Sequence, residues 1–531
     1  MNVAHWLVQR AEELTVDTAV MSRVENRIIS FEDLDARSNR WAAGLRKHGI
    51  ARGERTLVMV RAGIDLITLT WALFKAGAVP VLIDPGMGRR SFLSCVAQVQ
   101  PTSFVGIPLA HAFALTGSAS FASVQRRITV GSYGFGHPTL ESLALDDGPV
   151  LEDVADSEEA AVLFTSGSTG APKGAIYTHG IFDAQVRSLQ ALYGFQPGEI
   201  DCAAFPLFSL FDAALGMTSL IPPVNPSRPG RCNPEAVART IAAYHASTAF
   251  GSPAVWNRVA DWCMSHAFRL RDLHRVIIAG ASVSPELVLK LRMIMPGEVH
   301  TPYGATEALP VASISGEELV GPRYETPAGT HVASARGAGT CVGRLAPGME
   351  LRVVPVSDAP LDTLVTLPQG QVGELAVRGP VVTLGYAGLP EATRMARIVE
   401  ADGTVWHRMG DLGRIDEEGR IWLAGRRTER VETSSGMLYT DQLEGIANAI
   451  AHRRTALIGV GARPTQRPFL VVEGWGDAAL AKQLAEALPQ VEGVLFKWKF
   501  PVDVRHNAKI HRLELAKWAS TRVPARALVT G

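Results

Sequence analysis

The chain has 531 residues, 47% of them hydrophobic, and its 52 Lys and Arg residues balance its 52 Asp and Glu residues. At roughly 100–200 residues per domain, this length predicts about three structural units with sizeable cores. A nucleic-acid-binding protein usually carries a basic excess or a basic stripe, and neither is present. We therefore expect no nucleic-acid partner.

The cysteines exclude two further classes of protein. They are odd in number, they lie far apart, and no CxxC pair occurs, so neither a disulfide framework nor a zinc site is expected. We expect reduced, mostly buried side chains at these positions: Cys95, Cys202, Cys232, Cys263 and Cys341.

Targeting signals are also absent from the pattern. Residues 1–14 lack the basic and then apolar regions of a signal peptide. The most apolar stretch, 57–83, is interrupted by Arg61, Asp65 and Lys75, so no membrane-spanning helix of about 20 apolar residues is expected. We expect a soluble, cytoplasmic protein, with peripheral association with membranes or greasy partners left open.

In chain order, the first clear element is a helix that begins near Ser30. Ser30 followed by Asp33 is a variant of the capping box, and Leu34, Trp41 and Leu45 then fall near one face. Buried strands follow at 56–60, 79–83, 160–165 and 276–280, with amphipathic helices such as 235–245 between strands. This alternation predicts an α/β fold with layered, mostly parallel sheets.

The pattern changes from Gly370 to short strands and turns, and βα patterns return in the last hundred or so residues. The sequence therefore predicts an N-terminal domain of residues 1–426 that contains a β-rich subdomain, 370–426. It also predicts a small α+β C-terminal domain, 427–531.

The strongest local signal is the polar, glycine-rich segment 165–174, which directly follows an apolar strand. Glycines let the backbone approach an anion, successive amides can form an anion-binding nest, and Lys173 adds positive charge. A linker would rarely follow a buried strand and end on a lysine, so we interpret the segment as a phosphate-binding loop. Its spacing is not that of a Walker A motif.

Four later segments carry chemistry that suits a nucleotide. In TPYGATE, 301–307, a Tyr can stack on a purine, a Thr can bond phosphate and Glu307 can ligate Mg²⁺. Asp411 can accept from ribose hydroxyls, and Arg426 suits phosphate or carboxylate recognition. Lys509 lies in a turn-like segment near the C-terminus. Each of these, taken alone, would be an ordinary turn or surface residue.

Together, in this order and spacing, the motifs resemble the adenylate-forming superfamily of acyl-CoA synthetases, adenylation domains and luciferases, from about residue 31 to 518. The resemblance implies an ATP site between a large N-terminal and a small mobile C-terminal domain, with ATP and Mg²⁺ as cofactors. It implies catalytic roles for Lys173, Thr306, Glu307 and Lys509. It implies Glu307 and Thr165 as metal ligands. The nucleotide-binding residues it implies are Thr165, Ser166, Gly167, Ser168, Thr169, Gly170, Lys173, Gly280, Ala281, Ser282, Tyr303, Gly304, Thr306, Asp411, Arg426 and Lys509.

Departures from the usual motifs point to one branch of that superfamily. Ser209 stands where many ligases have a His that gates the acyl pocket, and Ser435 stands at the position of the usual hinge-side Gly. The segment 501–509 reads PVDVRHNAK. The runs PVDVRHNAKI, TPYGATEALPVA, GAGTCVG and HRMGD are similar to the β-lactone synthetases of bacterial olefin biosynthesis. The resemblance implies a long-chain 2-alkyl-3-hydroxy acid as substrate, activated as its acyl-AMP and closed to a β-lactone by its own hydroxyl. It also implies a thiolase-like condensing enzyme, a reductase and a lactone decarboxylase as partners.

Alternatives stay open at this point. A long-chain acyl-CoA ligase, or an acyl-AMP ligase that loads a carrier thiol, would share the adenylation half. A silent nucleotide- or acyl-binding protein is disfavoured because five charged motif residues are retained together. The base for the 3-hydroxyl is not identified; His179, Asp212 and His506 are the candidates. Substrate chain length and stereochemistry, oligomeric state, domain orientation and the end product, alkene or lactone, are not determined.

Overall fold

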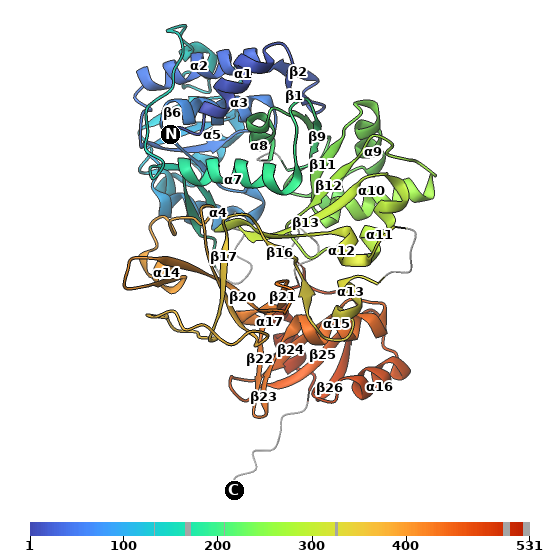
Figure 1. The fold of residues 1–531 in the computed structure, drawn as a ribbon. Coiled ribbons are helices and arrows are strands. Elements are labelled where there is room, and N and C mark those ends of the chain that lie inside the picture. Colours follow the sequence, from blue (N-terminus) through green and yellow to red (C-terminus); the bar gives the residue numbers. More distant parts are fainter. Residues whose placement is uncertain (132, 165–170, 206–207, 324–327, 503–509, 524–531) are drawn as a thin grey trace.

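The computed structural model describes residues 1–131, 133–164, 171–205, 208–323, 328–502 and 510–523 (Figure 1). The predicted α/β class is confirmed. Figure 1 shows the first two-thirds of the chain, blue to yellow, at one end and the last hundred residues, orange to red, at the other. Within the described ranges, no helix combines the length and apolar character needed to cross a bilayer.

The first large sheet has the order β6-β5-β3-β4-β7-β8, and every neighbouring pair is parallel except the β7–β8 hairpin. Its strands are β3 (Arg55–Met59), β4 (Val79–Leu82), β5 (Ser103–Gly106), β6 (Arg126–Thr129), β7 (Glu159–Phe164) and β8 (Gly174–Thr178). The predicted strands 56–60, 79–83 and 160–165 are therefore confirmed. The predicted phosphate loop connects β7 to β8.

The second large sheet has the order β16-β14-β13-β12-β11-β9-β10-β1-β2 and is parallel through its centre. Its strands are β1 (Thr18–Ser22), β2 (Arg27–Ser30), β9 (Ile200–Ala203), β10 (Thr218–Ile221), β11 (Thr248–Gly251), β12 (Arg275–Ile278), β13 (Glu298–Ala305), β14 (Ala308–Ser315) and β16 (Arg344–Leu345). A core between the two sheets buries side chains of several helices.

Helices cover both sheets because their apolar faces need burial. They are α1 (His5–Leu14), α2 (Phe31–Lys47), α3 (Ile64–Lys75), α4 (Arg89–Val99), α5 (Pro108–Leu115), α6 (Leu140–Leu143), α7 (His179–Tyr193), α8 (Phe208–Leu215), α9 (Pro234–Ala243), α10 (Pro253–Ser265), α11 (Pro285–Ile294), α12 (Gly316–Val320) and α13 (Thr330–Ser334). The helix predicted near Ser30 is α2: the Ser30 hydroxyl accepts from the Asp33 amide at 3.1 Å. The side chains of Leu34, Trp41 and Leu45 are buried, as predicted.

The predicted β-rich region is an antiparallel sheet, β15-β21-β20-β18-β17, with β19 paired to β20. Its elements are β15 (Thr340–Cys341), β17 (Glu350–Val354), β18 (Gly373–Arg378), α14 (Pro390–Met395), β19 (Arg397–Val399), β20 (Val405–Ile415) and β21 (Ile421–Arg426). The sheet includes two strands that precede Gly370, so it begins earlier in the chain than expected.

The last part of the chain folds around a three-stranded sheet, β24-β25-β26, with its own apolar clusters. Its elements are the β22 (Val431–Thr433) and β23 (Gly436–Leu438) hairpin, α15 (Thr440–Ala451), β24 (Thr455–Val460), β25 (Arg467–Glu473), α16 (Ala478–Ala487), β26 (Gly493–Lys497) and α17 (Arg512–Ser520). A short 3₁₀ helix, Arg427–Glu429, connects it to β21. The domain boundary between residues 426 and 427 stays a prediction.

A buried ion pair joins β20 and β18 of the antiparallel sheet and anchors the segment after β17 and the end of α14 to it. Arg408 and Glu374 pair at 2.6 Å, and each side chain is only 1% exposed. Arg408 also donates to the carbonyl oxygens of Ser357, Ala359 and Met395, so its charge is fully solvated by protein groups. Removing one partner of such a pair leaves the other charge buried without compensation.

We expect Arg408→Met to destabilise the fold by about 3–5 kcal/mol, because Glu374 would lose its closest cationic partner and keep only Arg427, whose Nε lies 3.4 Å from Glu374 Oε1. The matched control is Arg414→Met in the same strand, a half-buried arginine stacked on Trp422, which should cost about 1 kcal/mol or less. Thermal melting of both variants measures the difference. Equal melting temperatures would contradict the importance given to this pair.

Candidate active site

One continuous cavity of about 2790 Å³ lies where the two large sheets, the antiparallel sheet and the C-terminal part meet. It is lined by every described residue that the sequence predicted for nucleotide binding or catalysis: Lys173, Gly280, Ala281, Ser282, Tyr303, Gly304, Thr306, Glu307, Asp411 and Arg426. Thr165–Gly170 and Lys509 lie outside the described residues. The structure therefore brings together segments that are more than two hundred residues apart in sequence.

The hairpin between β13 and β14 presents Thr306 and Glu307 to this cavity. Gly304 precedes the turn, and a Cβ there would lie only 2.6 Å from the Ala308 carbonyl oxygen, so the close strand approach requires glycine. The Tyr177 hydroxyl donates to the Thr306 carbonyl oxygen at 2.5 Å. The turn is thus fixed by its own strands and by a neighbouring strand of the other sheet.

A second set of contacts fixes the Glu307 side chain. The Tyr386 hydroxyl donates to Glu307 Oε1 at 2.7 Å, and Lys173 Nζ lies 4.8 Å from the centroid of the Tyr386 ring. Burial raises the pKa of Tyr386, and the Glu307 charge raises it further, so the phenol stays protonated and remains a donor. Sequence reasoning missed Tyr386, although the glycines that flank it in GYAG are a turn signal.

His407 is a further cavity residue that sequence reasoning missed. It is 6% exposed on β20, and burial lowers its pKa to about 4 despite the nearby Glu307 charge. The imidazole is therefore neutral at physiological pH and can offer one donor and one acceptor beside Glu307 and Lys173. The only sequence signal was its place in WHRMGD, four residues before Asp411.

Asp411 joins two sheets. The Tyr303 hydroxyl donates to its Oδ2 at 2.7 Å, and Arg426 Nε lies 3.0 Å from its Oδ1. Asp411 lies inside β20, paired in register with Arg426 at the end of β21. This antiparallel register explains why the two motif residues meet.

Gly280, Ala281 and Ser282 follow β12 and precede α11. Gly280 has a φ of +93°, a left-handed conformation that strongly favours glycine. The chain turns there at the carboxyl end of a central parallel strand, the place where open α/β sheets bind ligands.

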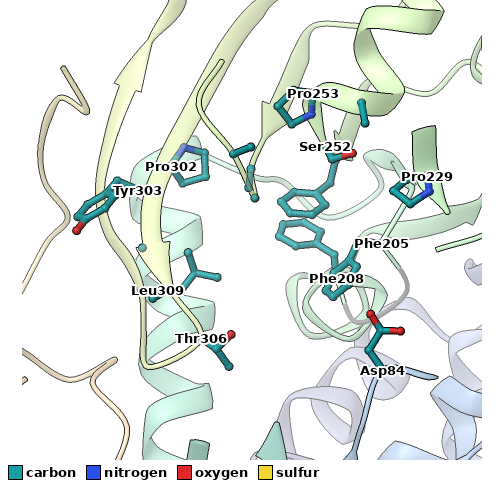
Figure 2. A pocket seen from close by; sticks show the side chains of 18 of the residues that line it. Asp84, Phe205, Phe208, Pro229, Ser252, Pro253, Pro302, Tyr303, Thr306 and Leu309 are labelled. Carbon is teal, nitrogen blue, oxygen red and sulfur yellow. The ribbon is translucent and has the colours of Figure 1, made fainter. Parts of the chain in front are cut away.

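The other half of the cavity is apolar. Phe208 of α8 stacks on Phe250 of β11, with ring centroids 4.1 Å apart and planes at 6°. Figure 2 shows Phe205 and Phe208 on one side of the pocket and Tyr303, Leu309 and Thr306 on the other. Such a wall can accept a long alkyl chain next to the polar half.

The segment after Lys509 is tied to the connection between the two parts of the chain. Arg512 bonds both carboxylate oxygens of Glu444 and Glu429 Oε2, the last at 2.8 Å. Glu429 belongs to the short helix that follows Arg426. Neither Arg512 nor its two acidic partners were identified from the sequence, because each becomes informative only through long-range contact.

Two candidates for the base are placed away from the cavity. His179 begins α7, its Nδ1 accepts from the Val3 amide at 3.2 Å, and burial lowers its pKa to about 4. Asp212 is fully buried and accepts from Ser219 Oγ at 2.7 Å, and burial together with the charge of Asp201 raises its pKa well above the usual range. Neither residue lines the cavity. His506 lies outside the described residues.

The cavity fits a nucleotide and one divalent cation. It offers cationic groups at Lys173 and Arg426, a fixed carboxylate at Asp411 and a turn of small residues at 280–282. No cluster of three potential metal-ligating side chains occurs among the described residues. Mg²⁺ needs none, since it is commonly bound by one or two carboxylates together with phosphate oxygens. Glu307 could supply that carboxylate.

The chain is similar to known proteins in sequence and in fold. The model of the AMP-binding enzyme family matches residues 7–387. The chain is 44% identical to the olefin β-lactone synthetase of Stenotrophomonas maltophilia strain K279a over 94% of this chain and 92% of that protein. It is 43% identical to the olefin β-lactone synthetase of Xanthomonas campestris pv. campestris, over 93% and 91%. An amide bond synthetase from Marinactinospora thermotolerans has the same fold, with a TM-score of 0.79 and 21% identity over 97% of this chain and 99% of that one.

The buried His407 predicts a pH dependence of stability. Its folded pKa of about 4 lies below the ordinary value of 6.5, so between these values the unfolded chain binds more protons than the folded chain. Stability should therefore be lost as the pH falls from 6.5 towards 4. Chemical denaturation at about pH 7 and about pH 5 measures this loss, and His407→Gln should make it smaller. The control is His274→Gln, a change at an exposed histidine, which should keep the full pH dependence of stability. If His407→Gln also kept it, the pH dependence would not come from His407.

Proposed function

The chain belongs to the AMP-binding enzyme family, and we propose that it closes a long-chain 2-alkyl-3-hydroxy fatty acid to a β-lactone at the expense of ATP. It is an ATP-dependent, AMP-forming ligase. The observation that carries the proposal is the 44% and 43% identity to two olefin β-lactone synthetases over more than nine-tenths of the chain. The cavity supports it, because a polar nucleotide half and an apolar half are continuous.

In the first half-reaction, the substrate carboxylate attacks the α-phosphorus of ATP and displaces pyrophosphate. Charge builds on the phosphates, and preorganised cations stabilise it. We assign Lys173 and the loop 165–170 to the β- and γ-phosphates, Thr306 to the α-phosphate and Lys509 to the reacting carboxylate. Asp411 would hold the ribose hydroxyls with Arg426 beside it, and Tyr303 with Gly280–Ser282 would border the adenine.

Glu307 is the residue we assign to Mg²⁺, with Thr165 as a second ligand. The ion would neutralise the pyrophosphate charge as it develops. The Tyr386 hydroxyl keeps one oxygen of Glu307 in place, 2.7 Å away, and leaves the other oxygen for the ion. The neutral His407 adds no competing charge next to that carboxylate.

In the second half-reaction, the 3-hydroxyl attacks the acyl carbon, its proton is released, and AMP leaves. Holding the hydroxyl close to the carbonyl makes the attack intramolecular, which offsets part of the cost of a strained ring. The apolar wall that includes Phe208 and Phe250 would also exclude the water that could hydrolyse the anhydride. We propose that residues 427–531 move as a domain and bring Lys509 to the site. We further propose that a condensing enzyme and a reductase supply the hydroxy acid, and that a decarboxylase consumes the lactone.

A product assay tests the proposed function. The enzyme is incubated with ATP, Mg²⁺ and a synthetic 2-alkyl-3-hydroxy fatty acid, with and without coenzyme A, and the products are identified by NMR. We expect a β-lactone, AMP and pyrophosphate without coenzyme A. A thioester that forms only with coenzyme A would replace this function with that of an acyl-CoA ligase and leave adenylation intact.

Lys509→Ala tests the catalytic assignment of the lysine. Loss of one preorganised donor to a developing charge typically costs about 3–4 kcal/mol, so adenylation should fall by roughly two to three orders of magnitude. ATP–pyrophosphate exchange measures this half-reaction alone. Lys517→Ala, an exposed lysine on α17, is the matched control and should keep the parent rate. An equal rate in Lys509→Ala would refute the assignment.

A further inference from the structure

Helix α5 exposes an apolar face. Its sequence, PLAHAFAL, has one polar side chain, His111, and that side chain is buried with Nε2 3.1 Å from the Ile128 carbonyl oxygen. Leu109 and Leu115 are each 69% exposed. A surface helix normally has the opposite arrangement, with its polar residues towards water. We therefore expect this face to contact an apolar surface.

The exposed face is continuous with the cavity. Leu109 and Phe113 line it from α5, and Phe92 of α4 packs edge-to-face on Phe113 with ring centroids 5.6 Å apart. Val24 is 60% exposed and also lines the cavity. Exposed apolar side chains therefore line the same cavity as Phe208 and Phe250.

The rim of this face is basic. Arg61, Arg89 and Arg90 are exposed, and Arg61 and Arg89 also line the cavity. Arg89 donates to the Thr116 carbonyl oxygen at 2.6 Å, which fixes its charge at the end of α5. Asp84, a carboxylate that also lines the cavity, is half-buried and accepts from the Gly86 amide. Exposed positive charge therefore lies at the end of α5 and along the cavity that Leu109 lines.

We propose that the α5 face binds the surface of an anionic phospholipid bilayer. Shallow apolar side chains surrounded by arginines match the chemistry of that surface: leucines enter the acyl boundary while guanidinium groups meet the phosphates. The proposed function adds a reason for the location, since a very long-chain acid resides in membranes and can enter the cavity beside Leu109 and Phe113. Binding itself does not depend on that function.

The test is flotation of the full-length enzyme with vesicles, without ATP or substrate. Vesicles of phosphatidylcholine alone are compared with vesicles that contain phosphatidylglycerol. We expect binding to the anionic vesicles that weakens as salt rises. Leu109→Gln/Leu115→Gln should lower the partition coefficient by about tenfold or more, since both apolar contacts are lost. Arg90→Gln should reduce the preference for phosphatidylglycerol.

The matched control is Met293→Gln/Val399→Gln, which changes two side chains that are each 54% exposed elsewhere. This control should bind vesicles like the parent. Absence of vesicle binding by the parent, or equal binding by the α5 variant, would overturn the proposal. So would a concentration-dependent dimer that the α5 variant abolishes without any vesicle binding, because a second copy would then cover the face. Lactone formation from a short, soluble 3-hydroxy acid, measured in parallel, separates failure of this proposal from failure of the proposed function.

Discussion

The active site depends on one buried carboxylate. Asp411 accepts from Tyr303 and pairs with Arg426, so a strand of the nine-stranded sheet is joined to two strands of the antiparallel sheet. Burial and the Asp411 charge raise the pKa of Tyr303, which keeps its phenol protonated as the donor. Tyr303 lies on β13, and β13 ends at the turn that carries Thr306 and Glu307. The contact between Tyr303 and Asp411 therefore also determines where these phosphate-facing residues lie.

Much of the fold could be predicted from local pattern. The apolar runs that became β3, β4, β7 and β12 and the cap at Ser30 are local features, decided by a few neighbouring residues. The motif residues were also identifiable, because glycine, carboxylate and lysine at these spacings suit a nucleotide. The start of the antiparallel sheet was placed late, because β15 has only two residues and because the long segment 355–372 separates β17 from β18.

The sequence could not show which partners these side chains meet, because those partners are distant along the chain. Asp411 was identified as a nucleotide-binding residue, but its place inside β20 opposite Arg426 follows from the β20–β21 register. His179 and Asp212 had suitable chemistry for a base, yet His179 accepts from the Val3 amide, Asp212 accepts from Ser219 Oγ, and neither lines the cavity. Tyr386, His407 and Arg512 were missed for the same reason: each acts through a partner that is distant along the chain.

The requirements of lactone closure differ from those of thioester formation in one physical respect. A thiol must reach the anhydride from outside, whereas the 3-hydroxyl is already attached to the substrate, so the site gains by being closed to other nucleophiles. Two departures agree with this difference. Ser209, where many ligases have a gating His, is buried on α8 directly after Phe208, and Ser435 lies exposed at the tip of the β22–β23 hairpin. Because ATP and the acid are the only substrates and no thiol has to reach the anhydride, apolar side chains of α5 at the cavity can serve entry of the acid.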